Sequence, residues 1–242
     1  SAAAPRRTWA ELHGGALRLA AAEAAARHLG PICVIAASAA DADKLEREMA
    51  FFGPRALRRF PDYETLPYEP ISPPQDLLAD RLLALHRLAR GEPETLVLEA
   101  GALLERLPPP EFIVSRSLYL ALGDRFDPTE MTKRLSEHGY LRVEQVAEPG
   151  EFAVRGAVFD IFPTGSAAPV RVDLFDDEIE TLRTFDAETQ RSAGKTDRIE
   201  ILPAREFPFD EAAIKFFRER FREHFPVEPG RCPVYRTISD AQ

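Results

Sequence analysis

The stretch that most constrains the fold covers residues 148–185, where extended segments alternate with turn residues. Glycine, proline and aspartate mark the turns, and the pattern predicts three strands. The first strand ends at Phe162, before a break at 163–166, and an acidic turn at 176–178 separates the other two. Strands joined by such short turns pair antiparallel, so we expect an antiparallel sheet here.

The middle strand of this stretch has two chemically different faces. Side chains alternate along a strand, which separates an apolar set from a mixed set: Val170, Val172 and Leu174 against Arg171, Asp173 and Phe175. An arginine beside an exposed phenylalanine is common at protein–protein contacts. An ordinary sheet with one solvated face gives the same pattern, so both interpretations stay open at this point.

Charge and cysteine content exclude several classes of function. The formal net charge of the 242 residues is -9, so the chain as a whole lacks the basic footprint of a nucleic-acid-binding protein. Cys33 and Cys232 have no CxxC spacing, which predicts neither a disulfide framework nor a zinc site and fits a reducing cytoplasm. No run of about 18 apolar residues occurs, so no membrane span is expected.

Before residue 108, helical and extended patterns alternate. The expected elements are helices over 16–29, 41–52 and 75–90, with buried strands over 31–37 and 95–98. This alternation predicts an α/β layer with a parallel sheet.

The character of the chain changes after the prolines at 108–110. Residues 112–114 look extended, a helix begins at Asp127 and Pro128, and residues 140–146 precede the three strands. With a further strand over 198–202, these elements predict an α+β unit. A last helix is capped by Asp210, and 226–242 shows no clear element. The predicted division is 1–116, 117–203 and 204–242.

The most plausible place for a phosphate-binding loop is the segment that contains His13, Gly14, Gly15 and Arg18. Such a loop needs a lysine followed by serine or threonine, because the lysine contacts the phosphates and the hydroxyl holds magnesium. Neither residue is present, and an arginine does not replace them. No Ser/His/Asp, Cys/His or metal-ligand spacing occurs elsewhere, so the sequence predicts no cofactor and no active site.

Four segments carry a resemblance to a known family, at 60–76, 150–163, 171–180 and 202–207. They resemble the bacterial transcription-repair coupling factors (Mfd), and the resemblance covers about residues 9–225. The amino-terminal part of that family is in turn similar to the excision-repair protein UvrB. The resemblance implies a degenerate RecA-like, UvrB-like parallel-sheet domain (1a over 1–116, 1b over 204–242). An α+β domain, domain 2, is inserted over 117–203.

Two departures from UvrB favour the coupling factors. The segment at His13 lacks an intact phosphate-binding loop, and the region around Tyr63 and Tyr68 is too short and proline-rich to be UvrB's tyrosine-rich DNA hairpin. The resemblance therefore implies a non-hydrolysing fragment, whereas the intact family protein is an ATP-dependent DNA translocase through other domains. The alternatives are a UvrB-type nucleotide-dependent helicase subunit and a structural spacer without a partner.

The resemblance also implies a partner and the residues that bind it. In the family, domain 2 binds UvrA, and the matching interface positions are Arg155, Arg171 and Phe175. The family's C-terminal domain covers this surface in the intact protein, and other domains contact RNA polymerase and DNA. The expected role is therefore a cytoplasmic adaptor that recruits UvrA to RNA polymerase stalled at DNA damage.

Overall fold

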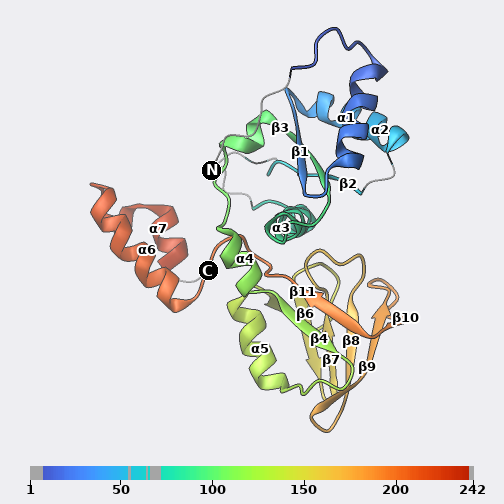
Figure 1. The fold of residues 1–242 in the computed structure, drawn as a ribbon. Helices are drawn as coiled ribbons and strands as arrows, with labels where there is room; N and C mark the ends of the chain where they lie inside the picture. Colours follow the sequence, from blue (N-terminus) through green and yellow to red (C-terminus); the bar gives the residue numbers. More distant parts are fainter. Residues whose placement is uncertain (1–7, 54–55, 64, 66–71, 240–242) are drawn as a thin grey trace. The chain divides into compact units, whose positions relative to one another are not determined.

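The computed structural model describes residues 8–53, 56–63, 65 and 72–239, which form two compact units (Figure 1). The first unit comprises 1–64 and 87–106, and the second comprises 65–86 and 107–242. The predicted division at 116 and 203 stays a prediction. Tyr68, in the proline-rich segment, lies outside the described residues.

The first unit is an α/β layer around three parallel strands in the order β1-β3-β2. Its elements are α1 (Gly15–Arg27), β1 (Ile32–Ala36), α2 (Ala39–Phe52), β2 (Leu57–Arg59), β3 (Thr95–Glu99) and the 3-10 helix η1 (Ala100–Leu104). The Ser38 hydroxyl caps α2 by accepting the Asp41 N–H at 3.2 Å. Ala42 of α2 packs with Ala36 and Val97 of the strands, which confirms the predicted parallel α/β layer.

The second unit is built on a six-stranded sheet in the order β10-β9-β8-β7-β6-β5. Its strands are β5 (Leu141–Arg142), β6 (Glu151–Arg155), β7 (Val158–Ile161), β8 (Val170–Phe175), β9 (Glu178–Phe185) and β10 (Ser192–Thr196). All neighbours pair antiparallel except β5 and β6. The predicted combination of a parallel-sheet domain and an antiparallel α+β domain is therefore confirmed.

The segment expected to form one strand up to Phe162 is instead a hairpin of β6 and β7. Gly156 has φ +62° and Ala157 is not left-handed, the pattern of a type II′ turn with glycine at its first central position. The expected strand over 140–146 is reduced to β5, and β10 forms where a polar loop was expected. The hairpin places β7 between β6 and β8, so side chains of β7 can contact those of both neighbouring strands.

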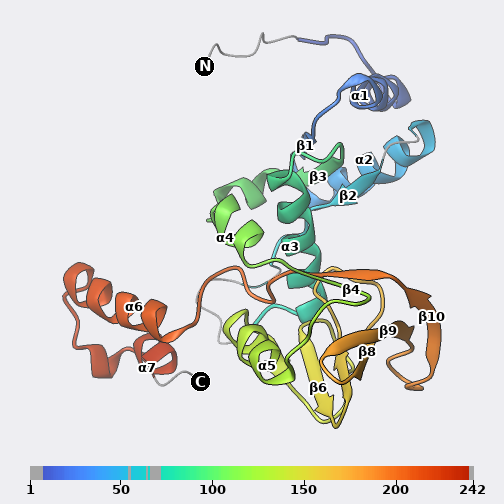
Figure 2. The same cartoon turned by 60° about the horizontal axis from the view of Figure 1, so that its bottom comes forward.

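One face of this sheet is covered by the core of the second unit. The helix α5 (Pro128–Glu137) lies along the sheet in both ribbon views, with the two-stranded sheet of β4 (Leu118–Ala121) and β11 (Arg198–Ile201) beside it (Figures 1 and 2). Side chains from all of them share one apolar cluster, including Leu120, Leu135, Phe152, Phe159 and Ile201. As predicted, Asp127 caps α5 by accepting the N–H groups of Thr129 and Glu130.

The remaining elements are α3 (Gln75–Ala89), α4 (Pro110–Ser115), α6 (Glu211–His224), η2 (Pro229–Arg231) and α7 (Pro233–Ser239). The expectation of an extended segment at 112–114 is wrong: Pro110 starts a short helix there, and Ile113 is buried. The expectation of no element after residue 226 is also wrong. Tyr235 of α7 packs against the rings of Phe217 and Phe221, a contact that stabilises a seven-residue helix.

A buried tyrosine joins three segments of the second unit. Tyr140 lies three residues after the end of α5, and its hydroxyl donates to the Leu202 carbonyl at 2.7 Å and accepts the Thr164 N–H at 2.9 Å. Burial raises the pKa of Tyr140 to about 12, although the Thr164 hydrogen bond acts in the opposite direction. The neutral phenol is therefore the form that the fold requires.

The Tyr140→Phe variant should lose about 1–3 kcal/mol of unfolding free energy at pH 7, because two buried backbone groups lose a partner. The wild type should also lose stability as the pH rises from about 10, the ordinary tyrosine pKa, to about 12. Ionisation is then favoured only in the unfolded chain, and two pKa units correspond to about 2.7 kcal/mol.

Urea unfolding at pH 7, 10 and 11.5 measures both effects. The difference between wild type and Tyr140→Phe should shrink with rising pH, because the variant lacks this ionisation. If the difference in unfolding free energy between the two proteins stays constant with pH, the raised pKa of Tyr140 in the folded state is contradicted.

Candidate functional site

The second face of the six-stranded sheet carries charged side chains in register. Because successive residues point to opposite faces, Arg171 and Asp173 of β8 lie opposite the core-facing Val170 and Val172. Strand pairing sets Asp160 of β7 beside Arg171, and Arg183 of β9 on its other side. We call one set of side chains on these strands the arginine face: Arg155, Asp160, Arg171, Asp173, Phe175 and Arg183.

Asp160 is the centre of this face. Its side chain is 0% exposed, and it accepts two hydrogen bonds from Arg171, from Nε to Oδ1 at 2.7 Å and from Nη2 to Oδ2 at 2.9 Å. Oδ2 also accepts Nη2 of Arg155 from the end of β6. One buried carboxylate therefore holds two guanidinium groups, and its charge-assisted bonds are of the strong bidentate kind on the Arg171 side.

The two arginines are held without being buried. The Arg155 side chain is 48% exposed and that of Arg171 is 21% exposed. The hydrogen bonds to Asp160 raise the pKa of Arg171, with the charges of Asp160 and Asp173 acting in the same direction and desolvation opposing them. The Arg171 guanidinium also lies 4.8 Å from the ring centroid of Phe185. Because both arginine side chains remain partly exposed, both guanidinium groups can donate to a ligand at the surface.

A second, similar arrangement lies next to the first. Nη2 of Arg183 is 2.9 Å from Oδ2 of Asp173, and its Nε donates to the Thr181 hydroxyl at 3.2 Å. The Thr181 hydroxyl in turn donates to Asp173. Asp173 therefore holds the guanidinium of Arg183 by an ion pair, as Asp160 holds those of Arg155 and Arg171.

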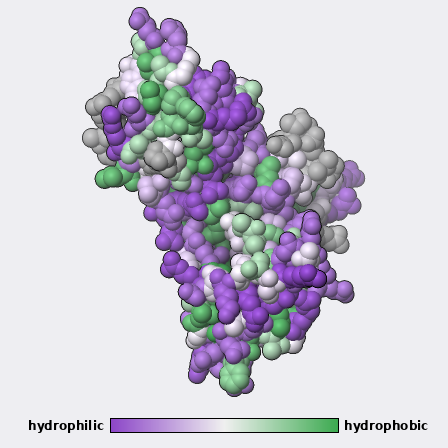
Figure 3. Space-filling view, turned by 90° about the vertical axis from the view of Figure 1, so that its right-hand side faces the viewer, coloured by the Kyte–Doolittle hydropathy of each residue, from purple (hydrophilic) through white to green (hydrophobic). Residues whose placement is uncertain are grey.

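Phe175 ends β8 on the same face, because its neighbour Leu174 packs against the core on the other face. The Phe175 side chain is 68% exposed and forms a register pair with Glu178. In the space-filling view, the region of these strands is largely hydrophilic with separate hydrophobic spots (Figure 3). An exposed aromatic ring beside ordered arginines has the composition of a protein-binding hot spot.

The other predicted site residues lie in the first unit, before and within α1. Residues 8–13 form no strand, and Gly14 is the residue that precedes the helix, with φ +54°. Nη1 of Arg18 donates to the Gly14 carbonyl at 3.1 Å, and its Nε is 2.9 Å from Glu48 Oε2. A phosphate-binding loop needs free N–H groups and positive charge after a strand, whereas this arginine is engaged by a carboxylate.

The structure thus brings together two of the three predicted partner-binding residues, Arg155 and Arg171. Both bind Asp160, a carboxylate that the sequence analysis does not single out. Asp160 and Arg183 were both missed. A signal for Asp160 is present in the sequence, because it is a carboxylate between the apolar residues Phe159 and Ile161. Nothing in a single strand shows that Arg183 pairs with Arg171.

The part of the chain that the structure describes contains neither a candidate metal site nor a helix that could cross a membrane. Among its residues, no group of three or more histidine, cysteine, aspartate or glutamate residues could hold a metal ion. Within the same ranges, no helix has the length and apolar character needed to cross a membrane.

Comparison with known proteins identifies the unit that carries the arginine face. Residues 118–207 match the family model of the UvrB interaction domain, and they include all six residues of that face. The chain is 38% identical to the transcription-repair coupling factor of Escherichia coli (strain K12) over 237 residues, which are 98% of this chain and 21% of that relative. The chain belongs to the transcription-repair coupling factor family.

Two further transcription-repair coupling factors match most of this chain over a small part of their own length. The Haemophilus influenzae transcription-repair coupling factor is 42% identical over 227 residues, or 93% of this chain and 20% of the relative. The Bacillus subtilis protein is 34% identical over 177 residues, or 73% of this chain and 15% of the relative. The chain therefore spans about a fifth or less of the length of these transcription-repair coupling factors.

Proposed function

We propose that this chain is a non-catalytic adaptor module that recruits UvrA to RNA polymerase stalled at DNA damage, in transcription-coupled nucleotide excision repair. The observation that carries the proposal is the Asp160 arrangement: a fully buried carboxylate presents two partly exposed arginines on a UvrB interaction domain. Such a surface fits carboxylates on a protein partner, because guanidinium groups recognise them in bidentate geometry.

Arg155 and Arg171 bind acidic groups of UvrA in this proposal, and Phe175 enters an apolar pocket. The recruiting part is residues 117–203, with the UvrB-like parts at 1–116 and 204–242. In the intact protein, a C-terminal domain covers this face, and further domains contact RNA polymerase and DNA and carry out ATP-dependent translocation. The family resemblance supports these further roles, which lie in parts of the protein beyond this chain.

The proposed absence of nucleotide hydrolysis has separate support in the first unit. Arg18 donates to the Gly14 carbonyl and pairs with Glu48, so a carboxylate stands close to the place where phosphates would bind. The alternative, a UvrB-type nucleotide-dependent helicase subunit, needs that site to accept magnesium-ATP. A clear rise in melting temperature with magnesium-ATP would favour this alternative, since a ligand stabilises the state that binds it.

Calorimetric titration of the purified chain with purified UvrA tests the proposal. We expect saturable binding that weakens as the salt concentration rises, because the contacts are between charges at a partly solvated surface. The triple variant Arg155→Ala, Arg171→Ala, Phe175→Ala is the comparison, with circular dichroism to check that it folds. No heat of binding from the folded wild-type chain would contradict the recruitment function.

A further inference from the structure

Arg183 is placed where a sheet ordinarily avoids a second arginine. In the register of β8 and β9 it is the direct neighbour of Arg171, and Lys195 of β10 is its neighbour on the other side. Like charges directly opposite each other on adjacent strands destabilise a sheet. The Arg183 side chain is nevertheless 41% exposed and pairs with Asp173, so the sheet presents its charge at the surface.

Asp173 and Thr181 fix the conformation of Arg183. The carboxylate contacts Nη2 at 2.9 Å, and the threonine hydroxyl accepts Nε at 3.2 Å while it donates to the same carboxylate. These contacts use Nε and Nη2 of a guanidinium that has five N–H donors, so donors remain for a ligand. An arginine held in this way loses little side-chain entropy when it binds a ligand.

The charged residues paired across the strands around Arg183 favour an acidic partner. In the two register rows that contain Arg171 and Asp173, two carboxylates, Asp160 and Asp173, stand among four cations: Arg155, Arg171, Arg183 and Lys195. These two rows thus carry more cations than carboxylates on a chain whose net charge is -9, and the next row adds Glu178 opposite Phe175. A local positive patch on a negative protein steers a negatively charged surface to that patch rather than to the rest of the chain.

We propose that Arg183 is a third partner-binding arginine and that Asp173 is its positioning residue. The inference rests on the proposed function and deepens it: UvrA would place acidic side chains across both β8 and β9, against Arg171 and Arg183 together. The binding surface then extends from β6 to β9, beyond the three positions that the family resemblance implies.

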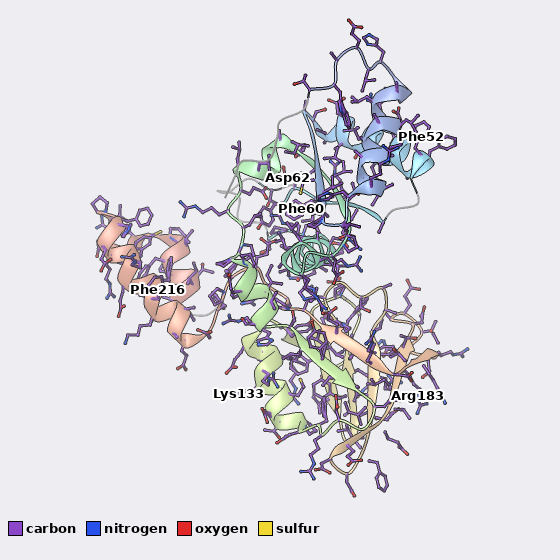
Figure 4. The ribbon with its side chains drawn as sticks, viewed as in Figure 1. Phe52, Phe60, Asp62, Lys133, Arg183 and Phe216 are labelled. Carbon is purple, nitrogen blue, oxygen red and sulfur yellow. The ribbon has the colours of Figure 1, made fainter. Side chains whose placement is uncertain are left out.

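The test compares Arg183→Ala with Lys133→Ala in calorimetric titrations with UvrA. Both variants remove one positive charge, but Lys133 is an exposed residue of α5, on the side of the sheet away from the arginine face (Figure 4). Arg183→Ala should weaken binding about tenfold, the effect of losing a partly exposed interface arginine, and Lys133→Ala should leave it within about twofold. The Arg183→Ala complex should also respond less steeply to salt.

The role of Asp173 is tested by a double-mutant cycle. Asp173→Asn alone should weaken UvrA binding several-fold, because Arg183 loses its charged partner. In the Arg183→Ala background, the same substitution should have no further effect, since Asp173 acts through Arg183. Equal effects in both backgrounds would mean that Asp173 supports the sheet in general, and this would overturn its positioning role.

The outcomes separate this inference from the proposed function. If wild type binds UvrA and the Arg155, Arg171 and Phe175 variants weaken it, but Arg183→Ala behaves like Lys133→Ala, only the inference fails. If the folded wild type does not bind UvrA, the proposed function fails as well. A titration with duplex DNA is the remaining arm: binding to DNA but not to UvrA, lost in Arg183→Ala, would assign the face to phosphates instead.

Discussion

Replacing Asp160 with alanine is expected to lower the free energy of unfolding of the second unit by about 3–5 kcal/mol, the usual cost of removing one member of a buried ion pair. The carboxylate is fully buried on β7 and is the shared acceptor of Arg155 and Arg171. Without it, Arg171 keeps its position beside Phe185 and Arg183 but loses both of its hydrogen bonds. A partly desolvated cation would then face a like charge.

Hydrogen exchange of the β7 and β8 peptides during urea unfolding measures this effect within the second unit, whatever the first unit does. The matched control is Asp80→Ala, which removes an exposed carboxylate from α3 and should change the stability by no more than about 0.5 kcal/mol. A loss below about 1 kcal/mol for Asp160→Ala would show that the ion pairs do not hold the sheet.

The second large effect concerns binding rather than stability. Phe175→Ala should weaken UvrA binding by ~2 kcal/mol or more, about thirtyfold, because an exposed ring beside ordered arginines has the properties of an interface anchor. Because the ring is 68% exposed, its removal should change the free energy of unfolding only slightly. Arg171→Ala should weaken binding by a similar amount, but it also removes a structural ion pair. Phe175→Ala is therefore the cleaner probe of the surface.

Phe216→Ala provides the matched control for Phe175→Ala. Phe216 lies on α6 with 61% of its side chain exposed, so the two variants remove similar exposed rings from different surfaces (Figure 4). Calorimetry should show wild-type affinity for Phe216→Ala. If both variants bind UvrA as wild type does, and both remain folded, Phe175 is not an anchor and the proposed docking surface loses its apolar part.

Local chemistry was sufficient to predict much of the fold. The Asp127–Pro128 start of α5 and the Asp210 start of α6 are determined by residues within one helical turn, and both are confirmed. The period-two pattern of β8 likewise separates Val172 from Arg171 without any knowledge of the neighbouring strands. The short helix α7 was missed, because its stability depends on Tyr235 contacting the distant ring of Phe221.

The candidate site was only half predictable for a related reason. The sequence and the family resemblance gave Arg155, Arg171 and Phe175, and alternation placed the last two on one face. The common partner of the two arginines depends on two connections: the turn at Gly156 folds Asp160 back beside Arg155, and the connection between β7 and β8 places it beside Arg171. The neighbour of Arg171 on β9 depends on the register across another hairpin. Pairing of this kind is a tertiary property, and a single-strand pattern does not contain it.

The Asp160 arrangement also has a consequence for chains that have not folded correctly. The carboxylate comes from β7, whereas its two arginines come from the strands on either side. A shift of one residue in the pairing of β7 would turn Asp160 toward the apolar core face and leave the arginines without their common acceptor. Under the proposed function, competence for recruitment is therefore coupled to native strand pairing, because a misfolded copy of the module would not display the arginine face.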